Sequence, residues 1–304
     1  MTTFLQICVD AASLGSLYAL AALGVGLLWG VMKLVNFAHG EFITIGAYAL
    51  IVPSGAVIPQ LFIGALPIWL MVPTMCLIVA VVALITERII FRPLRHADPS
   101  TLLVASFSLS FFLQYLILLI YGGRPKSIQI GASLNGEFAF GPLRTSWIDI
   151  VTISTTIVLL IAVALFMTRT RMGVQMRAAT QDFRMARMLG VRGNTVIATA
   201  FAVSGVLAAV VSFFLMVRTG ALAPRMAAPL VTIGFIATVI GGMGSMVGAI
   251  LGGFLVGVVS AFMQFILPEA MRPNRDAFVF AIVILMLLVR PNGLISLRSQ
   301  KERV

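Results

Sequence analysis

Nine apolar stretches, separated by short polar segments, make up most of this chain. An α-helix rises about 1.5 Å per residue and the hydrocarbon core of a bilayer is about 30 Å thick, so about 20 apolar residues cross it. By this measure we expect spans at residues 4–31, 61–85, 101–121, 148–168, 196–217, 229–240, 248–267 and 277–289. A ninth stretch, residues 36–52, is shorter and interrupted by polar residues, and whether it crosses is left open. The pattern predicts an all-α polytopic membrane protein with a bundle of about 8–9 transmembrane helices.

The composition excludes a water-soluble globule. Of 304 residues, 60% are hydrophobic and 10% are charged, whereas soluble domains have about 25% charged and about 45–50% apolar residues. We therefore expect residues 1–304 to form a single membrane domain. The start of the chain lacks a basic segment and its apolar run exceeds signal-peptide length, which predicts an uncleaved first span. Cys8 and Cys76 lie in apolar runs, which favours neither a disulfide nor a metal site.

The positive charges predict an orientation. If all nine stretches cross, one set of loops holds 14 of the 21 Lys and Arg residues, and the other set holds 7. The richer set includes Lys33, six arginines between residues 169 and 192, and the cations after residue 289. Because cytoplasmic loops carry the excess of Lys and Arg, we expect the C-terminus in the cytoplasm and the N-terminus outside. If residues 36–52 do not cross, only the side of the N-terminus changes. The net charge of +11 is thus a topology signal, and nucleic acid is not an expected partner.

The loop at residues 169–193 has the pattern of an amphipathic helix lying along the membrane surface. Apolar and small residues recur at spacings of three and four, namely Met172, Met176, Ala179, Phe183, Ala186 and Gly190. A neighbouring basic face includes Arg177, Arg184 and Arg187. Such a helix can be held by anionic lipid headgroups. Alternatively, its apolar ridge can enter a groove on a cytoplasmic partner.

Residues 33–42 place Asn36, His39 and Glu41 between two apolar stretches. Ionisable groups in a membrane face protein, a water-filled cavity or the interface, because exposure to lipid is costly. The segment is therefore either a cytoplasmic turn or a broken helix that lines a path for a solute.

Glycines are concentrated at residues 241–257, beside an apolar helix. A phosphate-binding loop would need a Gly-Lys pair, which the sequence lacks. The spacing of four residues is instead typical of tight packing between membrane helices, and it involves Gly248, Gly252, Gly253 and Gly257.

Motifs for catalysis or ion coupling are absent from the sequence. No paired-carboxylate, metal-binding or nucleophile motif occurs, and the few acids lie near the ends of the expected spans rather than in mid-span. We therefore expect a protein that is not an enzyme, whose driving force comes from outside this chain. That expectation favours docking to a partner as the role of the 169–193 segment.

Several motifs, in this order and spacing, closely resemble the branched-chain amino acid ABC importer permeases of the LivH type. They lie at residues 14–20 (LGSLYAL), 35–42 (VNFAHGEF), 46–48 (GAY), 87–95 (ERIIFRPLR), 176–182 (MRAATQD), 188–191 (MLGV), 241–253 (GGMGSMVGAILGG) and 290–294 (RPNGL). The resemblance covers nearly the whole chain.

The resemblance implies a multi-pass subunit of the bacterial inner membrane that works with other proteins. These partners are a second permease, either a copy or a distinct homologue, two cytoplasmic ATPases and a periplasmic binding protein, within membrane lipids. ATP and Mg²⁺ are expected on the ATPases, and no cofactor is expected on this chain.

Within this chain, the resemblance implies a coupling helix at residues 171–190. The expected ATPase contacts are Arg171, Met176, Arg177, Ala179, Asp182, Phe183, Arg184, Leu189 and Gly190. Polar and small residues are expected along a substrate path, namely Asn36, His39, Glu41, Ser106, Ser108, Ser204 and Ser245.

The chain departs from the family pattern at three positions. Gly234 and Ser260 stand where members often carry Lys and Glu, and Ser108 stands where a Gly is common. These changes leave the substrate open between branched-chain amino acids and urea, short amides or aromatic acids. A self-sufficient secondary carrier or channel is the alternative function.

Overall fold

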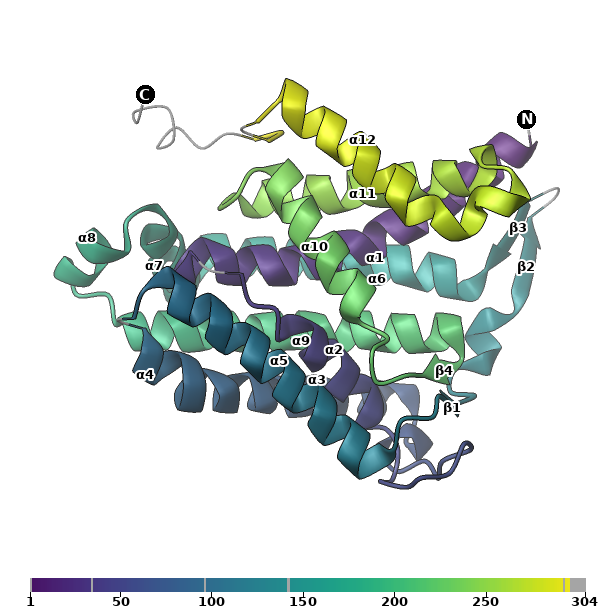
Figure 1. Ribbon diagram of the computed structural model, residues 1–304, viewed down its shortest axis with the longest axis horizontal. Helices are drawn as coiled ribbons and strands as arrows, with labels where there is room; N and C mark the ends of the chain where they lie inside the picture. The colour runs from purple at the N-terminus through teal and green to yellow at the C-terminus, as the bar shows by residue number, and fades with distance from the viewer. Residues whose placement is uncertain (1, 34, 96, 141–142, 292, 296–304) are drawn as a thin grey trace.

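Two long helices, α1 (Thr2–Met32) and α9 (Gly193–Thr219), form the centre of the molecule (Figure 1). In the computed structural model, 89% of the most apolar window of α1 and 78% of that of α9 are buried. The structure describes residues 2–33, 35–95, 97–140, 143–291 and 293–295. Helices at the periphery expose most of their side chains, as expected for surfaces that face lipid or another subunit; they are α3 (Ile68–Thr86), α5 (Pro99–Tyr121) and α6 (Trp147–Arg169).

The remaining elements are shorter, apart from α11. The other α-helices are α2 (His39–Tyr48), α4 (Arg92–Leu94), α7 (Arg171–Gln181), α8 (Phe183–Met188), α10 (Ala228–Gly241), α11 (Met246–Ile266) and α12 (Arg275–Val289). A π-helical turn, η2 (Glu87–Phe91), ends α3, and the 3₁₀ turns are η1 (Ile63–Ala65), η3 (Ala132–Asn135) and η4 (Glu269–Asn274). Two antiparallel pairs join β1 (Lys126–Ser127) to β4 (Ala221–Leu222) and β2 (Glu137–Phe140) to β3 (Leu143–Ser146).

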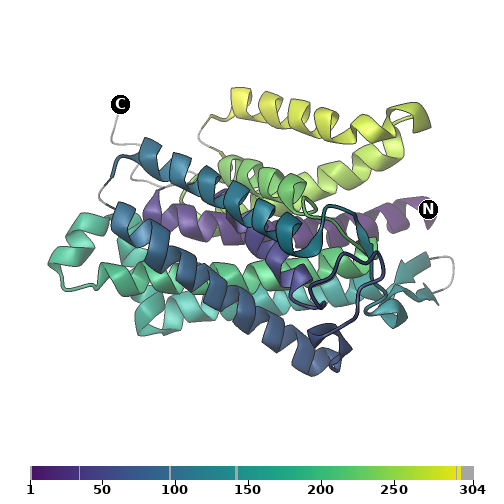
Figure 2. The same ribbon diagram turned by 60° about the horizontal axis from the view of Figure 1, so that its bottom comes forward.

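Six helices in the described part of the chain are long and apolar enough to cross a bilayer. They correspond to the predicted spans that begin near residues 4, 61, 101, 148, 196 and 248. The expected count of eight or nine is not confirmed, because α2 has 10 residues, α10 has 14 and α12 has 15, fewer than the about 20 that a crossing needs. Figure 2 shows α12 on the outer side of α10 and α11.

The two ends of the bundle differ in structure and charge. Helices α7 and α8 lie at one end, which we call the α7 end, and the strands lie at the opposite, hairpin end (Figure 1). At the hairpin end, Arg218 of α9 pairs with Asp149 of α6, and Ser13 of α1 donates to the same carboxylate at 2.7 Å. The buried ammonium of Lys126 donates to the carbonyls of Ser54 and Ala56 at 2.5 and 2.8 Å, and desolvation lowers its pKa.

Two groups of four helices repeat one packing pattern. The first group is α1, α2, α3 and α5, and the second is α9, α10, α11 and α12. Helix α11 packs chiefly on α1 and α3 packs chiefly on α9, while α10 lies against α1 and α2 lies against α9. Helix α5 contacts α2 as α12 contacts α10. Since α1 and α9 run in opposite directions (Figure 1), the two groups are related as inverted halves. The two short helices α2 and α10 occupy corresponding positions in them.

The glycines of α11 lie where other helices approach most closely. A Cβ added to Gly253 would lie 2.6 Å from the Cα of Ala19 in α1, and one added to Gly257 would meet Gly15. Gly248 and Gly252 face the backbone of α10 in the same way. The glycine run therefore packs α11 against α1 and α10.

Candidate functional site

A buried polar segment, residues 35–41, joins α1 to α2 in the interior of the bundle. Asn36, His39 and Glu41 are all buried. The Asn36 side chain accepts a hydrogen bond from the backbone N–H of Ala38 at 3.1 Å, which shapes the turn into α2. Asn36 Nδ2, His39 Nε2 and Glu41 Oε2 are buried with no hydrogen-bond partner among the described residues. Buried polar atoms of this kind require an explanation, because leaving them unpaired is costly.

His39 is fixed by Ser204 of α9. Its Nδ1 lies 3.0 Å from the Ser204 hydroxyl oxygen, and that oxygen lies 3.1 Å from the carbonyl of Gly24 in α1. A hydroxyl has one hydrogen. If it is donated to Gly24, the network assigns the ring hydrogen to Nδ1 and leaves Nε2 as an acceptor.

Glu41 is held by α5. Ser110 donates to Glu41 Oε1 at 3.1 Å, and Arg225 is close enough to act on the carboxylate electrostatically. Ser106 of α5 donates to the Val35 carbonyl at 3.2 Å. Ser108 is exposed on the outer face of the same helix, so the structure does not bring it to this segment. Ser110, which the sequence analysis missed, faces the segment instead, as i+4 spacing from Ser106 allows.

The first turns of α2 and α10 meet beside this segment. A Cβ on Gly40 would lie 2.6 Å from Val231 Cγ2 and 3.7 Å from the Ala227 carbonyl, so only hydrogen fits there. Phe37 stacks on Phe107 of α5, with ring centroids 4.0 Å apart. In transporters, interrupted helices in corresponding positions of two halves commonly form the solute site, with the positive helix N-termini near its anionic groups. The junction thus combines a carboxylate, an imidazole and two helix N-termini.

The segment at residues 169–193 forms two helices rather than the single helix expected. Asp182 ends α7, and its carboxylate caps α8 by accepting from the N–H of Met185 at 2.8 Å. Gly190 ends α8 with φ +88°, a left-handed conformation that favours glycine. The Val191 N–H donates to the Ala186 carbonyl at 3.1 Å.

The apolar ridge identified in the sequence packs on this chain's own bundle. Met176, Ala179 and Ala186 are buried, and Phe183 lies against Gly193 at the start of α9. Met176 and Ala179, which we expected as partner contacts, are thus covered by this chain's own bundle, and Phe183 is half-buried; these residues hold the α7–α8 pair in place.

A second apolar set faces outward. Met185, Met188 and Leu189 are 54%, 71% and 79% exposed, and they follow the i, i+3, i+4 spacing of one helix face. Arg171, Arg177 and Arg184 are exposed around the α7–α8 pair, as are Asp182 and Gly190. The free surface of the pair is thus a methionine-rich apolar patch beside arginines.

Lys33 links the buried polar segment to α7. Its ammonium donates to the Thr180 carbonyl at 3.1 Å, and desolvation lowers its pKa. Lys33 is the single non-glycine residue with positive φ (57°) among those the structure describes. A direct contact therefore joins α7 to a residue three positions before Asn36.

The last predicted path residue, Ser245, lies apart from this segment. Its hydroxyl accepts from the Gly248 N–H at 3.0 Å and caps α11. Over the described ranges, no three His, Cys, Asp or Glu side chains gather in a group that could hold a metal.

Comparison with known families gives a match over most of the chain. Residues 7–288 match the family described as the branched-chain amino acid transport system permease component. No solved structure matches the chain significantly.

Curated relatives match over nearly their full lengths. The high-affinity branched-chain amino acid transport system permease protein BraD of Pseudomonas aeruginosa is 31% identical over 99% of this chain and 98% of its own length. The corresponding LivH protein of Escherichia coli K12 shares 31% identity with the same coverage. A probable branched-chain amino acid transport permease protein LivH of Methanocaldococcus jannaschii is 27% identical over 92% of this chain and 88% of its own length.

Proposed function

This chain belongs to the branched-chain amino acid transport system permease family, and we propose that it is the membrane-spanning subunit of an ATP-driven importer for branched-chain amino acids or similar small solutes. The family and the full-length relatives support the solute class. The exposed patch of Met185, Met188 and Leu189 carries the proposal of an external motor. A monomeric surface rarely leaves such a methionine-rich apolar face without a partner.

The partners follow from what the chain itself lacks. Its sequence has no phosphate-binding loop, so ATP and Mg²⁺ would be bound by two cytoplasmic ATPase subunits. A second permease would complete the membrane core, and a periplasmic protein would deliver the solute. The α7–α8 pair is proposed as the coupling surface for the ATPases.

We infer from the distribution of positive charges that the α7 end lies in the cytoplasm. Lys33, the cations of η2 and α4, and those of α7 and α8 all belong to the richer set of charges, which the positive-inside rule assigns to that side. Since the start of α1 lies at the hairpin end and α12 ends at the α7 end (Figure 1), the start of α1 would lie outside and the end of α12 would lie on the cytoplasmic side of the membrane.

The proposed solute path runs through the junction of α2 and α10. The carboxyl group of Glu41 would bind an ammonium group, and the helix N-termini and Arg225 would favour a carboxylate nearby. A zwitterionic amino acid requires both features. ATPase closure would move α7 and, through the Lys33–Thr180 contact, the segment that carries these groups.

Reconstitution in proteoliposomes tests the proposal. Uptake of labelled leucine should require ATP, the ATPases, the second permease and the binding protein together, and unlabelled valine and isoleucine should compete. Competition by urea, acetamide or benzoate instead would reassign the solute. Gradient-driven uptake by this chain alone would support a secondary carrier and overturn the importer.

A further inference from the structure

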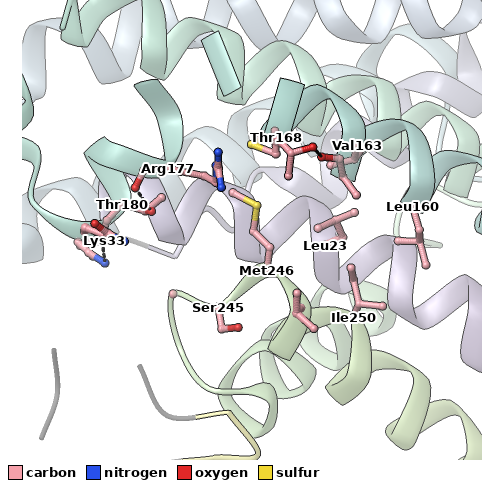
Figure 3. Close-up of a pocket in the computed structure, with 15 residues that line it drawn as sticks. Leu23, Lys33, Leu160, Val163, Thr168, Arg177, Thr180, Ser245, Met246 and Ile250 are labelled. Atoms are coloured by element: carbon pink, nitrogen blue, oxygen red, sulfur yellow. Dashed lines mark hydrogen bonds between the residues drawn. The ribbon is translucent and has the colours of Figure 1, made fainter. Parts of the chain in front are cut away.

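A cavity of about 680 Å³ opens between α6 and α11, with α1 along its floor (Figure 3). Helix α6 packs on α1 and α7, whereas α11 packs on α1, α10 and α12, which leaves room between the two. Because α6 is largely exposed, the space can be reached from the side of the bundle. Asn36, His39 and Glu41 are not among the residues that line it.

The two ends of this cavity differ in chemistry. Leu23, Leu160, Val163 and Ile250 line the part within the spans, and Lys33 and Arg177 lie toward the α7 end (Figure 3). No Asp or Glu is among the residues that line it. The capped N-terminus of α11 borders the same space through Ser245 and Met246, and helix N-termini favour anions.

We propose that this cavity binds one anionic phospholipid of the leaflet at the α7 end. The phosphate group would lie between Lys33 and Arg177, and an acyl chain would lie along Leu160, Val163 and Ile250. The charge complements an anionic headgroup, and the polar end lies where helices leave the membrane, at the depth of headgroups. A small amino acid has no acyl chain for the apolar part.

The bound lipid would stabilise the coupling surface. Lys33 contacts the Thr180 carbonyl, and Arg177 and Thr180 belong to α7. A phosphate between the two cations would therefore join the end of α1 to α7 by ionic contacts. This inference goes beyond the proposed function and depends on the membrane location of the chain, not on its solute.

Lipid binding by the purified full-length chain tests the proposal. Native mass spectrometry and thermal unfolding would compare phosphatidylglycerol with phosphatidylcholine of the same acyl chains. The variants are the double substitution Lys33→Gln/Arg177→Gln and the cavity-filling Ala164→Phe. The charge-matched control, Arg184→Gln/Arg187→Gln, removes two exposed arginines of α8 that do not line the cavity.

The wild-type chain should bind phosphatidylglycerol at least tenfold more tightly than phosphatidylcholine, since each basic group near an anionic surface contributes several-fold. The Lys33/Arg177 double variant should lose that preference and the control should keep it, while Ala164→Phe should weaken the binding of both lipids.

Retention of the preference by the Lys33/Arg177 double variant would overturn the site. If inorganic phosphate or glycerol phosphate competed with phosphatidylglycerol, the ligand of this cavity would be a free anion and not a lipid. Lipid-independent dimerisation that requires Lys33 and Arg177 would assign the cavity to a second copy. Because transport is not measured, these outcomes are independent of the proposed function.

Discussion

His39 and Ser204 connect the buried polar segment to a central helix of the bundle. The imidazole Nδ1 lies 3.0 Å from the Ser204 hydroxyl, which lies 3.1 Å from the Gly24 carbonyl. Three elements, namely α1, the start of α2 and α9, thus converge on one hydroxyl. The Cε1–Nε2 edge of the ring lies over Gly24, where a Cβ would be 2.6 Å from His39 Cε1 and 2.7 Å from Nε2. The absence of a side chain at residue 24 therefore sets the position of the imidazole.

Gly24→Ala should displace the His39 ring and reduce transport. Overpacking in a core costs about 1–3 kcal/mol, which exceeds the about 1 kcal/mol that alanine gains over glycine in a helix. We expect insertion into the membrane with a lower melting temperature and at least a tenfold loss of uptake in the reconstituted system. Gly55→Ala is the control, because a Cβ there meets no atom within 4 Å. Equal behaviour of the two variants would contradict the role of Gly24.

Glu41→Gln should reduce uptake while leaving assembly intact. Glutamine keeps the shape and can still accept from Ser110, but it removes the carboxyl group that we propose as the partner of the solute's ammonium group. We expect at least a tenfold lower rate of leucine uptake, with normal recovery of the ATPases on co-purification.

Ser110→Ala and Ser108→Ala provide a matched pair for this test. Ser110 contacts Glu41, whereas Ser108 is exposed on the other face of α5. Ser110→Ala should lower uptake severalfold and Ser108→Ala should have little effect. Normal uptake by Glu41→Gln would return residues 35–41 to the role of a structural turn.

Hydropathy alone locates the long helices and the glycine packing. Spans near residues 4, 101, 148 and 196 agree with the structure within a few residues, since about 20 apolar residues in succession leave few alternatives. The short helices are harder to predict from hydropathy. Residues 36–52 form a 10-residue helix after an irregular segment. Whether such a segment is buried inside the protein depends on the helices that pack around it, which hydropathy does not describe. The strand pairs β1–β4 and β2–β3 were missed because they have only two and four residues per strand.

The sequence predicted which residue types form the candidate site, but not which way their side chains face. Asn36, His39 and Glu41 were identified because polar groups in an apolar stretch are costly, and Ser204 proved to contact His39. Ser108 and Ser110 differ by two residues and cannot be separated without the rotation of α5. At residues 169–193, one apolar ridge was visible, but which of two apolar faces packs inward depends on Gly193 and α9.

Leu189→Asp should release the ATPase subunits without unfolding the protein. Leu189 is 79% exposed, so the change should alter stability by only about 0.5 kcal/mol, while a carboxylate in an apolar interface would be desolvated. Phe183→Asp should instead lower the melting temperature, because that ring packs on Gly193. Co-purification and thermal unfolding measure the two effects, with Leu189→Ala as a control for size. Full ATPase recovery with Leu189→Asp would argue against α8 as the coupling surface.

Gly293→Ala should destabilise the molecule more than a glycine substitution in open space. After α12, the chain returns to the end of α10, where the N–H groups of Leu294 and Ile295 donate to the carbonyls of Ile240 and Gly241 at 2.7 and 3.1 Å. Gly293 has φ +75°, and a Cβ there would lie 2.7 Å from the Gly242 nitrogen and the Ile240 oxygen.

Gly122→Ala separates the cost of backbone strain from the cost of the steric clash at residue 293. Gly122 has φ +82° and ψ +165°, a conformation that is essentially confined to glycine, with no atom within 4 Å of an added Cβ, so alanine there adds only backbone strain of about 1–3 kcal/mol. Gly293→Ala adds the steric clash and the loss of the two hydrogen bonds that cap α10. We expect a clearly larger fall in melting temperature for Gly293→Ala, with faster hydrogen exchange at the end of α10. Equal losses in the two variants would show that residues 293–295 do not stabilise α10.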